Sequence, residues 1–149
     1  MTYTQFEMTM KKVRVQESPQ TYHMGDSSDV ADFARNVLKM ETFPEERFYV
    51  ICLNTKGKIT GFSEVSKGTL HYTVACPREI FRIAVAMNAA SIILLHNHPS
   101  FDPTPSNEDI ATTEQMVKAG DVMGIPVLDH IIIAGGCYCS LGEMGYINH

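Results

Sequence analysis

The segment between residues 91 and 99 constrains the fold of this chain more than any other. It begins with the run Ser-Ile-Ile-Leu-Leu and continues directly into His-Asn-His-Pro. A short apolar run that ends in a loop predicts a buried strand. Side chains two residues apart on an extended chain point the same way. We therefore expect His96 and His98 to present their imidazoles to one point in space.

The segment after this strand has the chemistry of a helix start. A proline-rich loop leads to Ser106, a good N-cap residue, and Glu108 and Asp109 follow as first-turn acids. Two imidazoles and one carboxylate, with a fourth position left open, form the ligand set of a catalytic zinc site. A His-x-His pair alone is weak evidence, because histidines often end strands for packing or hydrogen bonding. The pair and the capped acid together predict Zn²⁺ bound by His96, His98 and Asp109.

The order of the remaining elements predicts an α+β fold, arranged as three α/β/α layers around a mixed sheet. Ser27, Ser28 and Asp29 predict the start of a helix that reaches about residue 40. Valines that alternate with charge at 11–15 favour an edge strand. We further expect strands at 47–53 and 58–65 joined by a turn, a turn at Gly68 into 69–75, helices at 78–90 and 106–122, and strands at 127–134 and 137–141.

The motif H-N-H-P-S-F-D-P-T-P-S-N-E-D at residues 96–109 resembles the JAMM (MPN+) metalloprotease signature, in the version carried by the bacterial RadC-type, or YeeS-like, proteins. The likeness runs from about Asp29 to Tyr146. One departure is Phe101, where such proteins usually have glycine; a bulky residue there could narrow the approach to the metal. The resemblance implies a JAB/MPN, cytidine-deaminase-like fold and a zinc-dependent metallopeptidase that hydrolyses an amide or isopeptide bond.

The resemblance also implies a general base and an oxyanion donor. It places the base, a glutamate, at the start of the first hairpin strand, where Glu46 matches. Glu64 is a competitor near another strand end, whereas Glu45 should face the other side of the extended chain. Ser106 has two interpretations, as the N-cap of its helix or as a hydrogen-bond donor to the oxyanion. His130 either orients a metal ligand or is a hydrogen-bonded core histidine.

The length of 149 residues suits one domain with a sizeable core. We interpret residues 1–26 as an N-terminal extension and residues 27–149 as the JAMM/MPN metallohydrolase domain. Full-length RadC-type proteins resemble this chain with an additional N-terminal helical, DNA-binding-like region. We therefore expect the catalytic-type domain alone.

The charge balance gives direct nucleic-acid binding no support, because the formal net charge is −5. No apolar run is long enough to span a bilayer and no secretory signal is present. The four cysteines fit neither a disulfide framework nor a zinc ribbon, which predicts free thiols and a cytoplasmic location. We expect a protein or peptide substrate, and an exposed edge strand or the methionine-containing helices could mediate a homodimer.

Two other functions need to be weighed against hydrolysis. The chain could be a non-catalytic, RadC-like module with a vestigial metal site, acting in DNA repair or anti-restriction processes. The complete ligand set favours hydrolysis, because a decaying site should lose its ligands first. A zinc deaminase would need His-x-Glu together with Pro-Cys-x-x-Cys. This chain has His-Asn-His and Cys137-x-Cys139, so we reject that function.

Overall fold

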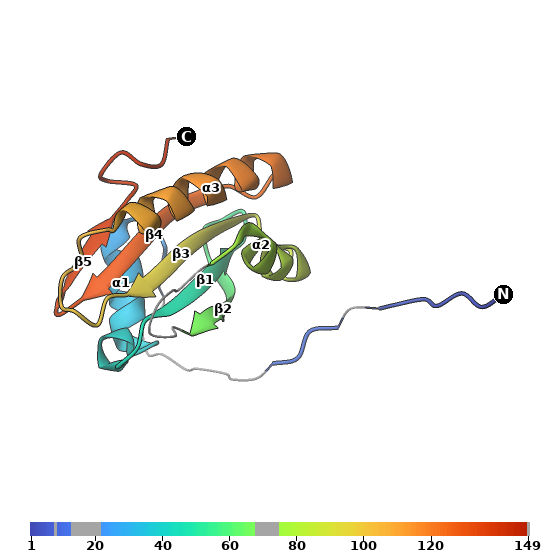
Figure 1. The fold of residues 1–149 in the computed structure, drawn as a ribbon, viewed down its shortest axis with the longest axis horizontal. Coiled ribbons are helices and arrows are strands. Elements are labelled where there is room, and N and C mark those ends of the chain that lie inside the picture. Colours follow the sequence, from blue (N-terminus) through green and yellow to red (C-terminus); the bar gives the residue numbers. More distant parts are fainter. Residues whose placement is uncertain (8, 13–21, 68–74, 149) are drawn as a thin grey trace.

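The computed structural model describes residues 1–7, 9–12, 22–67 and 75–148 (Figure 1). Three α-helices, one short 3-10 helix and five strands lie within these ranges. In chain order they are α1 (Ser27–Asn36), η1 (Met40–Thr42), β1 (Arg47–Leu53), β2 (Ile59–Lys67), α2 (Pro77–Ala86), β3 (Ser91–Asn97), α3 (Asn107–Met123), β4 (Val127–Ala134) and β5 (Cys137–Ser140).

The five strands form one mixed sheet in the order β2-β1-β3-β4-β5. β3 and β4 are parallel, because α3 carries the chain back to the same end of the sheet, and the other neighbours are antiparallel. Helix α1 covers one face of the sheet, while α2 and α3 cover the other (Figure 1). The predicted α+β fold, with α/β/α layers and a mixed sheet, is confirmed.

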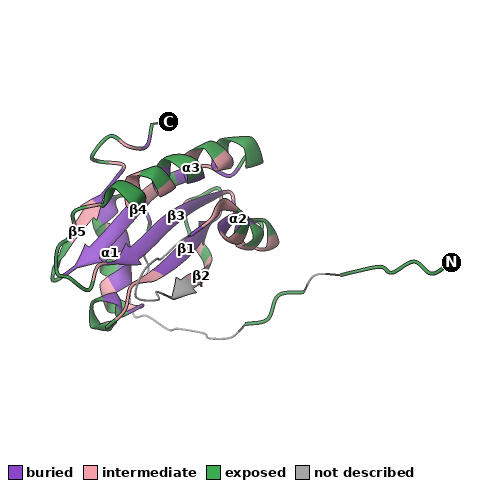
Figure 2. Ribbon diagram, viewed as in Figure 1, coloured by how far each residue is buried: buried purple, intermediate pink, exposed green. Residues whose placement is uncertain are grey.

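The alternation of side chains along the central strands builds a core on each face of the sheet. Tyr49 and Ile51 of β1 pack in the α1 layer, whereas Val50 and Cys52 pack in the layer of α2 and α3. Every residue of β3 is buried, as Figure 2 shows by its colour, and this confirms the strand predicted from its apolar run. A strand buried on both faces is typical of a sheet centre.

Two helices end earlier than predicted. Helix α1 ends at Asn36 and not near residue 40, because the chain leaves the helix and Lys39 adopts a left-handed φ of 56° before η1. Its N-cap is Asp26, whose carboxylate accepts a hydrogen bond from the Asp29 amide at 3.1 Å. Helix α2 ends at Ala86 and not at residue 90, and Asn88 follows with a φ of 52°. Residues with positive φ cannot continue a right-handed helix.

The predicted strand at 11–15 falls mostly outside the described residues, and the prediction for 69–75 falls outside them except for its last residue. Figure 1 shows the described N-terminal segment extending away from the body of the domain. Residues 1–7 and 9–12 contain no helix or strand. The boundary at residues 26 and 27 stays a prediction. Among the described residues, no helix has the length and apolar character needed to cross a bilayer.

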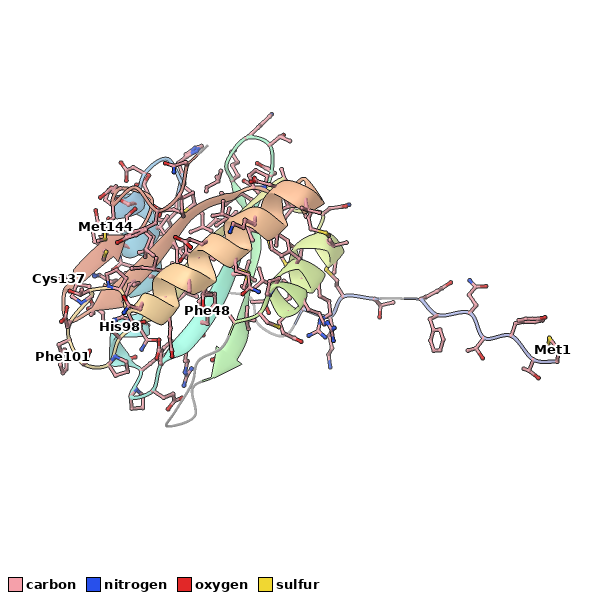
Figure 3. The ribbon with its side chains drawn as sticks, turned by 45° about the horizontal axis from the view of Figure 1, so that its top comes forward. Met1, Phe48, His98, Phe101, Cys137 and Met144 are labelled. Carbon is pink, nitrogen blue, oxygen red and sulfur yellow. The ribbon has the colours of Figure 1, made fainter. Side chains whose placement is uncertain are left out.

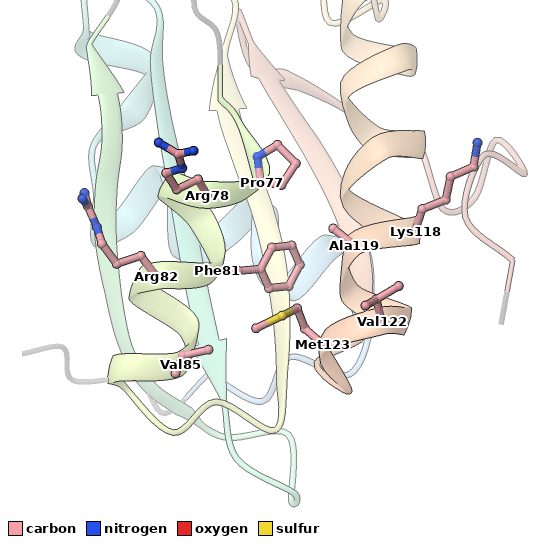
Figure 4. Close-up of a pocket in the computed structure, with 9 residues that line it drawn as sticks. All are labelled: Pro77, Arg78, Phe81, Arg82, Val85, Lys118, Ala119, Val122 and Met123. Atoms are coloured by element: carbon pink, nitrogen blue, oxygen red, sulfur yellow. The ribbon is translucent and has the colours of Figure 1, made fainter.

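A groove of about 630 Å³ lies between α2 and α3 (Figure 4). Phe81 of α2 and Met123 of α3 point toward each other across it, and Arg78, Arg82 and Lys118 lie along its sides. None of the predicted site residues lines this groove. The candidate chemistry therefore lies elsewhere, at the opposite end of α3.

Candidate metal centre

Four side chains that could hold a metal ion meet where β3 runs into its loop. They are Glu46, His96, His98 and Asp109, and one possible ligand atom from each lies within 4.8 Å of the others. Glu46 precedes β1, His96 is in β3, and Asp109 is in the first turn of α3. Figure 3 shows His98 beside the start of α3. The structure thus brings together all three predicted metal ligands and the predicted base.

Strand register explains why residues so far apart in sequence meet here. β1 and β3 are antiparallel, and Phe48 pairs with His96, so the chain just before β1 lies beside the end of β3. Phe48 stacks on the His96 ring, with centroids 5.5 Å apart and planes 9° apart. His96 is fully buried and His98 is partly exposed. One face of the cluster is therefore packed, and the other is reachable from solvent.

The spacing of the three predicted ligands fits a zinc ion. His96 Nε2 lies 3.0 Å from His98 Nε2 and 3.3 Å from Asp109 Oδ1, and His98 Nε2 lies 3.2 Å from Asp109 Oδ2. Zinc bonds of about 2.0–2.1 Å place tetrahedral ligand atoms about 3.3–3.4 Å apart. Two imidazole nitrogens and a carboxylate are also the donor types that zinc prefers. The residues present therefore match the group that the motif implies.

Hydrogen bonds on the far sides of the rings assign the histidine tautomers. His98 Nδ1 lies 2.9 Å from the Asp102 carbonyl, which can only accept, so Nδ1 donates and, in the neutral ring that could bind a metal, Nε2 is free of hydrogen. His96 Nδ1 lies 2.7 Å from His130 Nε2. The same assignment for His96 depends on which nitrogen of His130 carries its hydrogen.

The buried pair of Thr113 and His130 decides the tautomer of His96. The Thr113 hydroxyl donates to the Asp109 carbonyl at 2.7 Å, so it accepts from His130 Nδ1, which lies 2.6 Å away. Burial, together with the neighbouring His96, holds the pKa of His130 well below its usual value, so the ring is neutral. Its Nε2 is then an acceptor for His96 Nδ1, so the neutral tautomer of His96 carries no hydrogen on Nε2. Both alternatives for His130 therefore hold: it is a buried core residue and it orients a candidate ligand.

The carboxylate of Asp109 is kept ionised and in place. Burial alone would raise its pKa, but the imidazoles of His96 and His98, which donate to the carboxylate when they are protonated, lower the pKa far below the usual value. Asp109 also forms a capping box with Ser106: its Oδ2 accepts from the Ser106 amide at 2.8 Å. Burial lowers the pKa of His98, but the Asp109 carboxylate and the Asp102 carbonyl stabilise the protonated ring, and together they raise the pKa.

The structure separates the three candidate bases. Glu46 Oε1 lies 3.5 Å from His96 Nε2 and 3.9 Å from His98 Nε2, and its side chain is one-third exposed. Glu45 and Glu64 instead face Arg47, at 2.9 Å and 3.6 Å from its guanidinium nitrogens. Only Glu46 of these three reaches the cluster, because alternate side chains of the extended segment point to opposite sides.

Ser106 is exposed beside the cluster, and its two predicted roles are compatible. Its hydroxyl oxygen accepts a hydrogen bond from the Asp109 amide at 3.1 Å and so caps α3, as predicted. A hydroxyl that accepts through a lone pair keeps its own hydrogen for donation. Capping therefore leaves Ser106 able to donate to a bound group.

Phe101 lies at the outer edge of the loop between β3 and α3 (Figure 3). Its side chain is 76% exposed and contacts Gly135, where an added Cβ would come within 2.9 Å of the Phe101 Cβ. Its φ of 66° is unusual for a bulky residue. The ring rests on the turn between β4 and β5, so the expectation that it narrows the approach to the metal finds no support in this contact.

Two residues of the site, Asn97 and Thr113, were not predicted from the sequence. Asn97 lies inside the His-Asn-His motif and is 3% exposed, and Thr113 is fully buried in α3. A polar residue four positions after Asp109 lies on the same side of a helix, and this was the available signal for Thr113. For Asn97 the signal was a polar residue at the end of an otherwise apolar strand.

Comparison with known proteins identifies the family. A family model described as a RadC-like JAB domain matches residues 24–146. The chain belongs to the RadC-like JAB domain family. It is 48% identical over 108 residues to a UPF0758 protein of Caldanaerobacter subterraneus, covering 72% of this chain and 46% of the relative. It is 46% identical over 121 residues to a UPF0758 protein of Staphylococcus epidermidis, covering 81% of this chain and 53% of the relative.

A further relative is a UPF0758 protein of Methanosarcina barkeri, 48% identical over 109 residues, which cover 73% of this chain and 48% of the relative. The RadC-like JAB domain described here therefore spans about half the length of the curated relatives that it matches. The names of these relatives state no activity, so the family membership supports the fold, and any chemistry has to be argued from the residues of the site.

Proposed function

We propose that this RadC-like JAB domain is a zinc-dependent metallopeptidase of the JAMM type that hydrolyses an amide or isopeptide bond. One observation carries the proposal. Two hydrogen-free imidazole nitrogens and an ionised carboxylate converge at the spacing of a tetrahedral zinc site, and the Glu46 carboxylate faces the same point. Structural zinc sites are closed by four protein ligands, whereas catalytic sites keep a position open. Three candidate ligands, with the Glu46 carboxylate beside them as a possible base, favour a catalytic zinc site over a structural one.

The protein residues divide the work of hydrolysis. His96, His98 and Asp109 would hold the zinc, which when bound lowers the pKa of water toward about 7 and polarises a carbonyl oxygen. Glu46 would accept a proton from the attacking water and pass it to the leaving amine. Its position 3.5 Å from His96 Nε2 and its partial exposure support this role. Ser106 would donate its hydroxyl hydrogen to the oxyanion of the tetrahedral intermediate.

The experiment that tests the proposal begins with metal content. Elemental analysis of the purified protein should find about one zinc per chain, by the ligand count of such sites. The variants Asp109→Ala and His98→Ala should retain little zinc, because each removes a ligand. Near-full zinc in either variant would contradict the ligand assignment. Negligible zinc in the unaltered protein, even after reconstitution, would favour the non-catalytic module instead.

Hydrolysis is tested next, with the zinc-loaded protein and a library of peptides and isopeptide-linked conjugates. Glu46→Gln should still load fully at saturating zinc and should abolish cleavage, because an amide cannot accept the proton. The matched control is Glu64→Gln, which removes the carboxylate that faces Arg47 and should leave cleavage intact. If Glu64→Gln abolishes cleavage and Glu46→Gln does not, the base is misassigned.

A further inference from the structure

Asn97, the middle residue of the His-Asn-His motif, points away from the two histidines that flank it. Alternate side chains of a strand face opposite sides, so His96 and Asn97 cannot serve the same cluster directly. Asn97 is 3% exposed, and a buried amide needs partners for both its oxygen and its nitrogen. Both partners are backbone groups of the segment that carries Glu46.

The side-chain amide of Asn97 holds the peptide groups on both sides of Glu46. Its Oδ1 accepts a hydrogen bond from the Arg47 amide at 2.8 Å, and its Nδ2 donates to the Glu45 carbonyl at 3.0 Å. The described pairing of β1 with β3 stops at Phe48 and His96, so this amide continues the ladder one step past its last backbone pair. Glu46 is thereby fixed at its backbone relative to the strand that carries the histidines.

We propose that Asn97 is a positioning residue, which holds Glu46 against the metal ligands by binding the backbone on either side of it. This inference rests on the proposed function, because it assigns Asn97 a role through the base of that reaction. The C-terminal end of β3 then serves the site from both of its faces. His96 and His98 provide ligand nitrogens from one side, and Asn97 sets the distance between those nitrogens and the base from the other. A displacement of about 1 Å can cost about 10²-fold in rate, so such anchoring matters.

Zinc affinity provides a test that does not depend on finding a substrate. The dissociation constant is measured by competition with a chromogenic chelator for the unaltered protein, Glu46→Gln, Asn97→Ala and the double variant. Glu46→Gln should weaken binding roughly thirtyfold, because the attraction between a neighbouring negative charge and a dication is lost even at the dielectric constant of water. Asn97→Ala should weaken binding by a comparable factor. The double variant should bind no more weakly than Glu46→Gln alone, because Asn97 acts through Glu46.

The matched control is Asn54→Ala, at the other end of β1. The Asn54 side chain also makes two backbone hydrogen bonds, accepting from the Lys56 and Lys58 amides at 2.9 and 3.0 Å. This variant should leave the zinc dissociation constant unchanged. Should Asn97→Ala fail to fold, Asn97→Gln keeps the amide but moves it by one methylene, and its loss of affinity should likewise vanish in the Glu46→Gln background.

Each outcome separates the inference from the proposed function. Multiplicative losses in the double variant, or unchanged affinity in Asn97→Ala or Asn97→Gln, would overturn the positioning role and leave the zinc site standing. No zinc binding by the unaltered protein would overturn both. An unchanged affinity in Glu46→Gln would remove the electrostatic link between Glu46 and the metal, and the inference would fall with it.

Discussion

At the scale of single residues, the chemistry of this site depends on which ring nitrogens carry hydrogen. His96 faces the cluster through Nε2, and the opposite nitrogen lies 2.7 Å from the fully buried His130. Thr113 completes this series of hydrogen bonds, because its hydroxyl donates to the Asp109 carbonyl of α3 and accepts from His130. Partners of this kind orient a metal-binding histidine and raise its basicity.

His130→Leu should lower zinc affinity about 10- to 100-fold, because His96 Nδ1 would lose its acceptor and the ring its fixed orientation. Competition with a chelator measures the change. Ile131→Val is the matched control: it trims the adjacent buried residue, which packs in the opposite core, and should cost about 0.5–1.5 kcal/mol of stability without changing zinc affinity. Equal zinc affinity in His130→Leu and the unaltered protein would contradict the role of His130 as the hydrogen-bond partner that orients His96.

At the scale of elements, the first turn of α3 serves both stability and chemistry. The capping box between Ser106 and Asp109 satisfies two amide groups and fixes the Asp109 carboxylate beside the histidines. A helix N-terminus also favours a negative charge. The candidate ligand Asp109 is therefore held by the same hydrogen bonds that begin the helix.

Substitution of Ser106 should separate capping from catalysis. Ser106→Ala should lower the free energy of unfolding by about 1 kcal/mol, whereas Ser106→Gly should cost only a few tenths, because glycine is tolerated at the N-cap. Both variants lack the hydroxyl and should lose about 10²–10³-fold in kcat. Chemical denaturation and cleavage assays measure the two effects. Activity that falls only in step with stability would mean that Ser106 is a cap alone.

The ends of elements also show where local sequence information runs out. Ser106 and Gly124 bound α3 by their own preferences, and that helix was predicted nearly as found. The ends of α1 and α2 were predicted too late, because Lys39 and Asn88 adopt positive φ where neither residue type requires it. Both residues are exposed, so core packing does not dictate the conformation. Asparagine tolerates it at helix ends, which makes Asn88 a local stop signal, whereas no preference of lysine predicts it at Lys39.

At the scale of the whole molecule, the cluster joins parts of the chain that only the sheet brings together. Glu46 precedes β1, the histidines end β3, and Asp109 begins α3. A ligand that binds all three would couple their stability, because it binds the folded chain and not the unfolded one.

Removal of zinc should therefore lower the melting temperature. With free zinc at about 100 times its dissociation constant, binding adds about 2.7 kcal/mol, and chelation should lower Tm by roughly 5–10 °C. Scanning calorimetry with and without chelator measures the shift. Asp109→Ala should show almost none, since it lacks a ligand. A Tm that does not respond to chelator in the unaltered protein would contradict a zinc site spanning these elements.

The sequence by itself determined the buried strand, the paired histidines, the capped helix start and the three-layer fold class, because periodicity, caps and turn residues act over a few positions. The motif also singled out the three candidate ligands, and the family resemblance favoured Glu46 as the base with Glu64 as its competitor. Tertiary structure alone decided that Glu46, and not Glu64, meets the histidines, because that depends on the pairing of β1 with β3. It also decided the roles of Thr113, His130 and Asn97. Their partners are far away in sequence, and only the assembled sheet and helix bring those hydrogen bonds within reach.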